Sequence, residues 1–150
     1  MSLSPSPEEK LARARSDLRM GLPVALRAGA LEGIAAAAET LAEPRLADLL
    51  ALGGRADLAI TAHRAATLRA RAYDGDIARV VVPGEARVPW IRATADPSRD
   101  LQMPLKGPYS TRRGGDSALH RIAVMLAKQA HLLPAALVIS GLEGVEAIAA

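Results

Sequence analysis

The stretch DSALHRIAVMLAKQAHLLPAALVI, residues 116–139, contains a complete helix-to-strand unit. Asp116 or Ser117 can cap the first helical turn by accepting hydrogen bonds from backbone N–H groups. Pro134 ends the helix, and the apolar run that follows to Ile139 is typical of a strand buried on both faces. A long amphipathic helix leading into a buried strand predicts a sheet that the rest of the chain must complete. The apolar positions that form one helix face, spaced three and four apart, are Leu119, Ile122, Ala123, Leu126, Ala130 and Leu133.

Helix and strand signals alternate in the segments that precede this unit. Ser6 can cap a helix whose first position is Pro7 and whose third is Glu9, which together form a capping box, and Gly21 can end that helix. Further helices are predicted at 43–52 and 62–69. Predicted strands cover 23–26, 34–38, 57–60, 77–82 and 88–94.

This alternation predicts the α/β class, with a mixed sheet that carries helices on both faces. We expect residues 1–5 to be a disordered tail and residues 6–150 to form one domain, because 150 residues suffice for a single core. Residues 95–115 carry no regular pattern, which is typical of a functional loop or a surface crossing.

Composition argues against several classes of protein. The chain has no cysteine, which removes disulfides and thiolate metal sites and suits a cytoplasmic protein. The net charge of +3 comes from scattered arginines with few aromatic residues beside them, so nucleic acid is not an expected partner. No apolar run reaches the ~20 residues that cross a bilayer, and the N-terminus lacks a signal-peptide pattern, so no membrane partner is expected either.

Metal and catalytic motifs are absent from the sequence. His120 and His131 would share a helix face, but eleven residues separate them by ~16 Å, so they cannot hold one ion. We interpret them, with His63, as structural or solvent-facing and predict no metal site and no catalytic residue. Glu32, Glu39 and Glu43 are spread over a turn, a strand end and a helix start, and are interpreted as solvated carboxylates.

The segment Arg112-Arg113-Gly114-Gly115-Asp116 is a candidate anion site. Two arginines on a glycine turn at a helix N-terminus could hold a phosphate through guanidinium and backbone N–H donors. The alternative is a solvated loop with two surface arginines and an acidic cap. The residues proposed for ligand binding are Arg112, Arg113, Gly115 and Asp116.

Several segments resemble 3,4-dihydroxy-2-butanone 4-phosphate synthase, an enzyme of riboflavin biosynthesis, in order from about residue 10 to 140. The resemblance rests on "RxGxPV" entering the first strand and on "A-x-L-x-PA" before the last strand. It implies the fold of that synthase and a two-fold homodimer. The segments that carry it are 19–26, 36–40, 53–61 and 130–139.

The same comparison shows where the chain departs from the family. The family has an acidic loop of the form DDEDRENEGDL after its first strand, which binds magnesium and performs the proton chemistry on ribulose 5-phosphate. Residues 27–34 read RAGALEGI here, so Glu32 and Gly33 alone match. The GHTEA sequence that opens the family's last helix is also missing. The departures imply a relative without the magnesium ligands that stabilise an enediolate.

A closer resemblance is to the N-terminal domain of a subgroup of bacterial GTP cyclohydrolase II proteins. The passages that match are 95–101, 104–108 and 131–138. It implies a non-catalytic domain with a structural, dimerising role, which precedes a cyclohydrolase domain. The zinc of that catalytic domain has cysteine ligands, so this chain itself would hold no cofactor. Two alternatives stay open: a phosphate- or nucleotide-binding regulatory module, and a residual sugar-phosphate lyase that uses Glu32 and Glu39.

Overall fold

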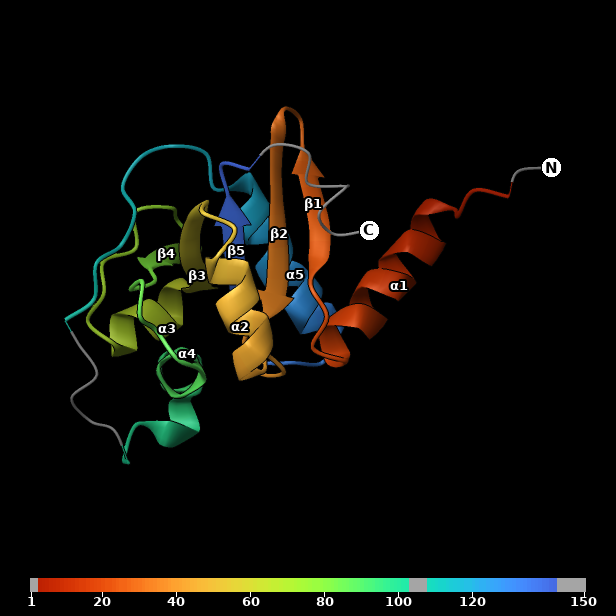
Figure 1. The fold of residues 1–150 in the computed structure, drawn as a ribbon. Coiled ribbons are helices and arrows are strands. Elements are labelled where there is room, and N and C mark those ends of the chain that lie inside the picture. Colours follow the sequence, from red (N-terminus) through yellow and green to blue (C-terminus); the bar gives the residue numbers. More distant parts are fainter. Residues whose placement is uncertain (1–2, 103–107, 143–150) are drawn as a thin grey trace.

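The computed structural model describes residues 3–102 and 108–142 (Figure 1). Residues 1–2 of the expected tail, residues 104–107 of the cyclohydrolase-like passage and residues 143–150 lie outside this range. The described helices are α1 (Pro7–Arg19), α2 (Glu43–Leu50), α3 (Ala62–Thr67), α4 (Val88–Ala95), η1 (Pro97–Arg99) and α5 (Ala118–Gln129). The described strands are β1 (Val24–Ala28), β2 (Leu31–Ala37), β3 (Arg55–Thr61), β4 (Ile77–Val81) and β5 (Ala136–Ser140).

One sheet with the order β1-β2-β5-β3-β4 organises the described residues. Strand β5, the last in sequence, lies at its centre and pairs with both β2 and β3. The predicted α/β class with helices on both faces is confirmed. The sheet itself is antiparallel and not mixed as predicted, since every pairing among the described strands is antiparallel. The strands that a crossover joins, β2 with β3 and β4 with β5, run parallel but are not neighbours, because one antiparallel strand lies between them.

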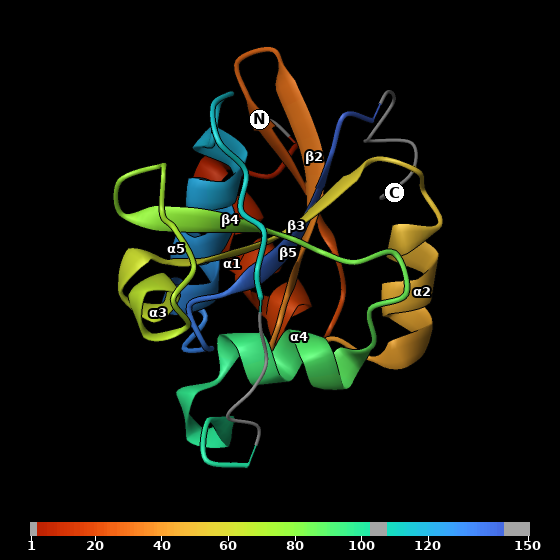
Figure 2. The same ribbon diagram turned by 90° about the vertical axis from the view of Figure 1, so that its left-hand side faces the viewer.

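Alternation along the strands divides the core into two layers. One side of the sheet packs against α2, α3 and α4 through residues such as Ile34, Leu58 and Leu137. The other side packs against α1 and α5 through residues such as Ala35 and Val138. Figure 2 shows α2 and α4 away from α5 across the sheet.

Helix α4 corrects one prediction. Residues 88–94 were expected to form a strand interrupted by Pro89, but Val88–Ala95 is helical. Pro89 sits in the first turn, where its missing N–H costs nothing, and the Val88 N–H donates to Glu43 Oε1 on α2 at 2.6 Å. A tertiary contact therefore completes the cap that the local sequence lacks.

The helix-to-strand unit of residues 116–139 forms largely as predicted. Asp116 Oδ1 accepts a hydrogen bond from Ala118 N at 2.9 Å, so Asp116 caps the start of α5. Helix α5 ends at Gln129 and not beside Pro134, because His131 adopts a left-handed conformation with φ of 62°. No helix among the described residues has the length and apolar character needed to cross a bilayer.

Candidate functional site

A cavity of about 420 Å³ opens on the α5 side of the sheet. Strands β3 and β4 each place a charged side chain on this face next to an apolar one. Asp57 lies two residues before Ala59 on β3, and Arg79 lies two residues after Ile77 on β4. Helix α5 supplies His120, and the loop before it supplies Gly115. The residues that line the cavity are Ala30, Leu31, Glu32, Arg55, Asp57, Arg79, Gly115, Asp116, Leu119, His120, Ser140, Gly141 and Leu142.

Asp57 is the central carboxylate of the cavity wall, and its side chain is 3% exposed. Its Oδ1 accepts from Arg112 Nε at 2.7 Å, and its Oδ2 lies 3.1 Å from His120 Nε2. Burial raises the pKa of Asp57, but the hydrogen bonds from His120 and Arg112 outweigh it, so the pKa lies below its usual value. An ionised carboxylate can only accept hydrogen bonds, so His120 donates through Nε2.

His120 is itself buried, and its second ring nitrogen has no hydrogen-bond partner in the part of the chain that the structure describes. The Nδ1 atom is inaccessible to solvent and makes no hydrogen bond with any described residue. The expectation that His120 is structural agrees with its place in the Asp57 pair, whereas His131 is exposed beyond the end of α5. The signal that could have pointed to Asp57 is an acidic residue that interrupts an apolar strand.

Arg79 forms a second buried pair beside the first. Its Nε and Nη2 atoms donate to the two carboxylate oxygens of Asp74 at 2.8 and 3.1 Å, and Nη2 also donates to the carbonyl oxygen of Gly114. Its Nη1 makes no hydrogen bond with a described residue and lies toward Gly115, where an added Cβ would be 3.6 Å away. Arg79 therefore presents one free guanidinium nitrogen to the cavity.

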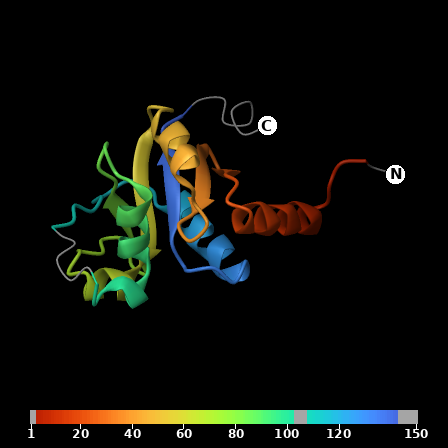
Figure 3. The same ribbon diagram turned by 60° about the horizontal axis from the view of Figure 1, so that its bottom comes forward.

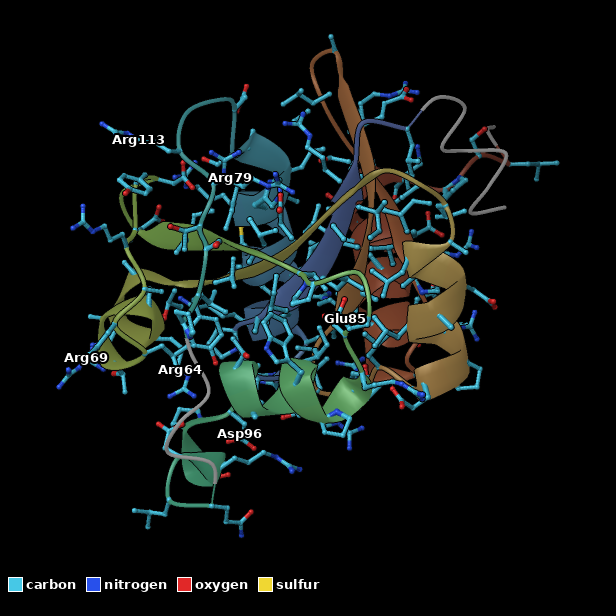
Figure 4. All side chains as sticks on the ribbon, turned by 60° about the vertical axis from the view of Figure 1, so that its left-hand side comes forward. Arg64, Arg69, Arg79, Glu85, Asp96 and Arg113 are labelled. Carbon is cyan, nitrogen blue, oxygen red and sulfur yellow. The ribbon has the colours of Figure 1, made fainter. Side chains whose placement is uncertain are left out.

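The predicted anion residues occupy different surroundings. The Arg112 guanidinium is committed to Asp57, whereas the exposed Arg113 stacks on Tyr73 with its Cζ 5.3 Å from the ring centroid. Figure 4 shows Arg113 pointing outward from the loop and away from Arg79. Gly115 and Asp116 do line the cavity. The structure thus separates the two arginines and brings Arg79 and Arg55, which the sequence did not single out, to the same cavity as Gly115.

The two glutamates of the residual-enzyme alternative do not share one site, because Glu32 lines the cavity described above whereas the exposed Glu39 does not. Glu32 lines the cavity and is held by Arg27, whose Nη2 donates to Glu32 Oε1 at 2.7 Å. Glu43 lies in a separate groove of about 580 Å³ between α2 and residues 84–87. Across the described residues, no three His, Asp or Glu side chains are placed so that they could hold a metal ion.

Known proteins resemble this chain in fold and not in sequence. No protein-family model matches the chain, and no curated protein matches its sequence. Solved structures do match. The Candida albicans 3,4-dihydroxy-2-butanone 4-phosphate synthase aligns at 16% identity with a TM-score of 0.61, over 86% of this chain and 78% of that one. The chain has the fold of this synthase.

Two further structures with the synthase fold agree. A cation-free form of 3,4-dihydroxy-2-butanone 4-phosphate synthase matches with a TM-score of 0.63 at 14% identity, over 89% of this chain and 78% of that chain. A two-domain synthase from A. baumannii matches with a TM-score of 0.61 at 13% identity. Our chain covers about half of that two-domain protein, 48% of its length, with 89% of its own.

Proposed function

We propose that this chain is a non-catalytic domain with the synthase fold, which dimerises and positions a downstream cyclohydrolase domain in a cytoplasmic GTP cyclohydrolase II-type protein of riboflavin biosynthesis. The observation that carries the proposal is the double pairing of Asp57. A carboxylate that works as an acid or base must be free to exchange a proton with its substrate. Asp57 instead holds two protein donors, and its lowered pKa keeps it ionised.

The remaining acids of the cavity support the same conclusion. Glu32 is tied to Arg27, and Asp116 caps the N-terminus of α5. The family's acidic loop and its GHTEA sequence are missing from the chain. The match to a two-domain synthase supports a role beside a second domain, because in that protein the same fold occupies only part of a longer chain. Zinc, in this proposal, belongs to the downstream domain and not to this chain.

The test is a magnesium-dependent assay of formate release from ribulose 5-phosphate. The Candida albicans synthase serves as the positive control under the same conditions. We expect no release above the background without protein. Release that depends on both magnesium and this chain, and that is lost in Asp57→Asn, would overturn the non-catalytic role and establish the residual lyase in its place.

The cavity also favours a second candidate function, the binding of a phosphate or nucleotide. The free Nη1 of Arg79, the exposed Arg55 and the backbone at Gly115 line one cavity at the start of α5, where the helix dipole favours an anion. Calorimetry with inorganic phosphate, GTP and flavin mononucleotide tests it. Loss of binding in Arg79→Gln supports this cavity as the binding site. Loss of binding only in Arg112→Ala/Arg113→Ala supports a site on the loop of residues 112–116. The absence of heat with all three ligands rejects a binding module for these anions.

A further inference from the structure

The cavity of about 420 Å³ lies at one end of the sheet. Gly33 of β2 and Arg55 of β3 both pair with Ser140, the last residue of β5. Figures 1 and 3 show the end of β5 beside the start of β3. The segment before α5 adds Gly115 and Asp116 to the wall. The cavity therefore gathers side chains from strands and from a helix start that are distant in sequence.

Two charged side chains of the cavity wall have no ion-pair partner among the described residues. They are the exposed Arg55 and Asp116, whose Oδ1 caps α5 while its Oδ2 accepts no hydrogen bond from a described residue. The wall thus offers one free carboxylate and one free guanidinium, which favours a ligand that carries both signs of charge. The other charged side chains of the wall are already paired: Asp57 with Arg112 and His120, Glu32 with Arg27, and Arg79 with Asp74.

The buried Arg79 gives the wall a further donor. Its side chain is 5% exposed, and its Nε and Nη2 atoms are occupied by Asp74 and by the carbonyl oxygen of Gly114. The Nη1 atom makes no hydrogen bond with a described residue and faces Gly115, the residue directly before Asp116. Figure 4 shows Arg79 beside the start of α5. A free guanidinium N–H group is best satisfied by a carboxylate or phosphate oxygen, so the anionic group of a ligand belongs at Nη1.

The charge of the wall distinguishes between these two anions. A phosphate dianion on Arg79 Nη1 would also lie near the free carboxylate of Asp116, and like charges at close range repel each other. An α-amino acid instead carries a carboxylate and an ammonium group on the same carbon atom. Its carboxylate can accept from Arg79 Nη1 while its ammonium group donates to Asp116 Oδ2. The adjacent positions of Gly115 and Asp116 therefore favour a zwitterion.

Apolar residues complete the wall and indicate the kind of side chain that the ligand carries. Ala30, Leu31, Leu119 and Leu142 line the cavity together with the charged residues. An apolar ligand side chain would remove this surface from water, which is favourable. The cavity volume also lies within the range of small-molecule sites, roughly 300–1,000 Å³.

We propose that the cavity binds an apolar α-amino acid, with its carboxylate group on Arg79 and Arg55 and its ammonium group on Asp116. The proposal rests on the binding module given above as the second candidate function, and it names the ligand class of that site. It does not depend on the dimer or on a downstream domain, because all the contacts come from this chain.

Titrations followed by protein NMR test the ligand class, because they also measure millimolar dissociation constants. L-Leucine is compared with 4-methylpentanoate, which lacks the ammonium group, and with 3-methylbutylamine, which lacks the carboxylate. We expect L-leucine to bind and each analogue to bind at least about tenfold more weakly, since each loses one charge-assisted contact. L-Glutamate is the matched zwitterion, whose charged side chain the apolar part of the wall should reject.

Asp116→Asn tests the ammonium contact. Asparagine caps a helix as well as aspartate does, so α5 should keep its start while the charge is lost. We expect the dissociation constant of L-leucine to rise about tenfold and that of 4-methylpentanoate to stay unchanged. Arg55→Gln should weaken the binding of both carboxylates and leave 3-methylbutylamine unaffected. Asp48→Asn, which removes an exposed acid of α2 outside the cavity, is the matched control.

The outcomes separate this proposal from the functions proposed above. Equal affinity for L-leucine and 4-methylpentanoate, or equal affinity of Asp116→Asn and Asp48→Asn for L-leucine, rejects the zwitterion. Binding of inorganic phosphate, GTP or flavin mononucleotide without binding of L-leucine, L-valine or L-phenylalanine rejects the amino acid and keeps the second candidate function. No binding of any of these ligands rejects both and leaves the dimer proposal unaffected. Circular dichroism shows whether each variant is folded, and if Asp116→Asn is unfolded, Arg55→Gln must by itself weaken the binding of L-leucine.

Discussion

His120 Nε2 and Asp57 Oδ2 lie 3.1 Å apart although 63 residues separate them in sequence. Strand β3 and helix α5 bring them together across one face of the sheet, and Arg112 completes the contact from the loop before α5. A buried carboxylate with two donors stabilises the fold as long as both donors stay in place. The stability of the domain therefore depends on Asp57 and His120, two residues that line the cavity.

Replacement of Asp57 tests that link. Asp57→Asn keeps the shape of the side chain but removes the charge that holds Arg112 and His120. We expect the free energy of unfolding to fall by about 2–3 kcal/mol, near the lower end for a broken buried pair because Arg112 retains some access to water. Urea unfolding measures it. Asp76→Asn is the control, since the Asp76 side chain is 70% exposed and pairs with Arg121 at the surface. A loss as small as that of the control would contradict a stabilising role for the pair.

The same pair predicts a pH dependence. The pKa of Asp57 is lower in the folded chain than the ~3.9 of an unfolded chain, so the folded state binds fewer protons. The stability from this carboxylate is fully present above pH ~4 and is lost as the pH falls through the folded pKa. The gap in unfolding free energy between wild type and Asp57→Asn should therefore shrink from pH 7 to pH 3. Denaturant titrations at both pH values measure it, and a constant gap would rule the linkage out.

Arg64 fixes the end of α4 by a buried fork. Its Nε donates to Thr94 O at 2.8 Å and its Nη2 to Ala93 O at 3.0 Å, while Nη1 and Nη2 bind the two carboxylate oxygens of Asp100 at 2.7 and 2.8 Å. Figure 4 shows Arg64 between α3 and the segment that follows α4. Lysine cannot reproduce this planar arrangement. Arg64→Lys should lower the free energy of unfolding by about 2–3 kcal/mol.

The control for Arg64 is Arg71→Lys, which changes an exposed side chain in the same way. A double-mutant cycle with Asp100→Asn then isolates the pair from the carbonyl contacts. If Arg64→Lys unfolds at the same urea concentration as the control, the fork does not stabilise α4.

Gly33 permits the close approach of β2 to β5. A Cβ at this position would lie 2.8 Å from the carbonyl oxygen of Ile139 and 3.1 Å from Leu119 Cδ1. Gly33→Ala should therefore cost about 1–3 kcal/mol, because backbone of the central strand would have to shift. Gly84→Ala is matched, since its Cβ would meet nothing within 4 Å. Thermal unfolding compares the two variants. Equal melting temperatures would show that the β5 backbone can shift without loss of stability.

The sequence by itself determined the local elements. The capping box at Ser6 and the apolar face from Leu119 to Leu126 specify α1 and α5, because caps and side-chain periodicity act within a few residues. The apolar run before Ser140 likewise identified a strand buried on both faces, which the structure places at the centre of the sheet. The resemblance to the synthase, carried by short motifs, anticipated the fold that the solved structures share.

The tertiary structure alone decided which distant residues meet. Residues 88–95 became a helix because Glu43 on α2 caps the Val88 N–H, a contact across 45 residues. Arg112 and Arg113 are adjacent in sequence, but the loop turns one to Asp57 and the other to Tyr73. Ion pairs between strands and helices depend on how the chain crosses the sheet. No local pattern specifies that path, so the sequence did not single out Asp57 or Arg79 and could not predict which charged residues of this cavity form pairs.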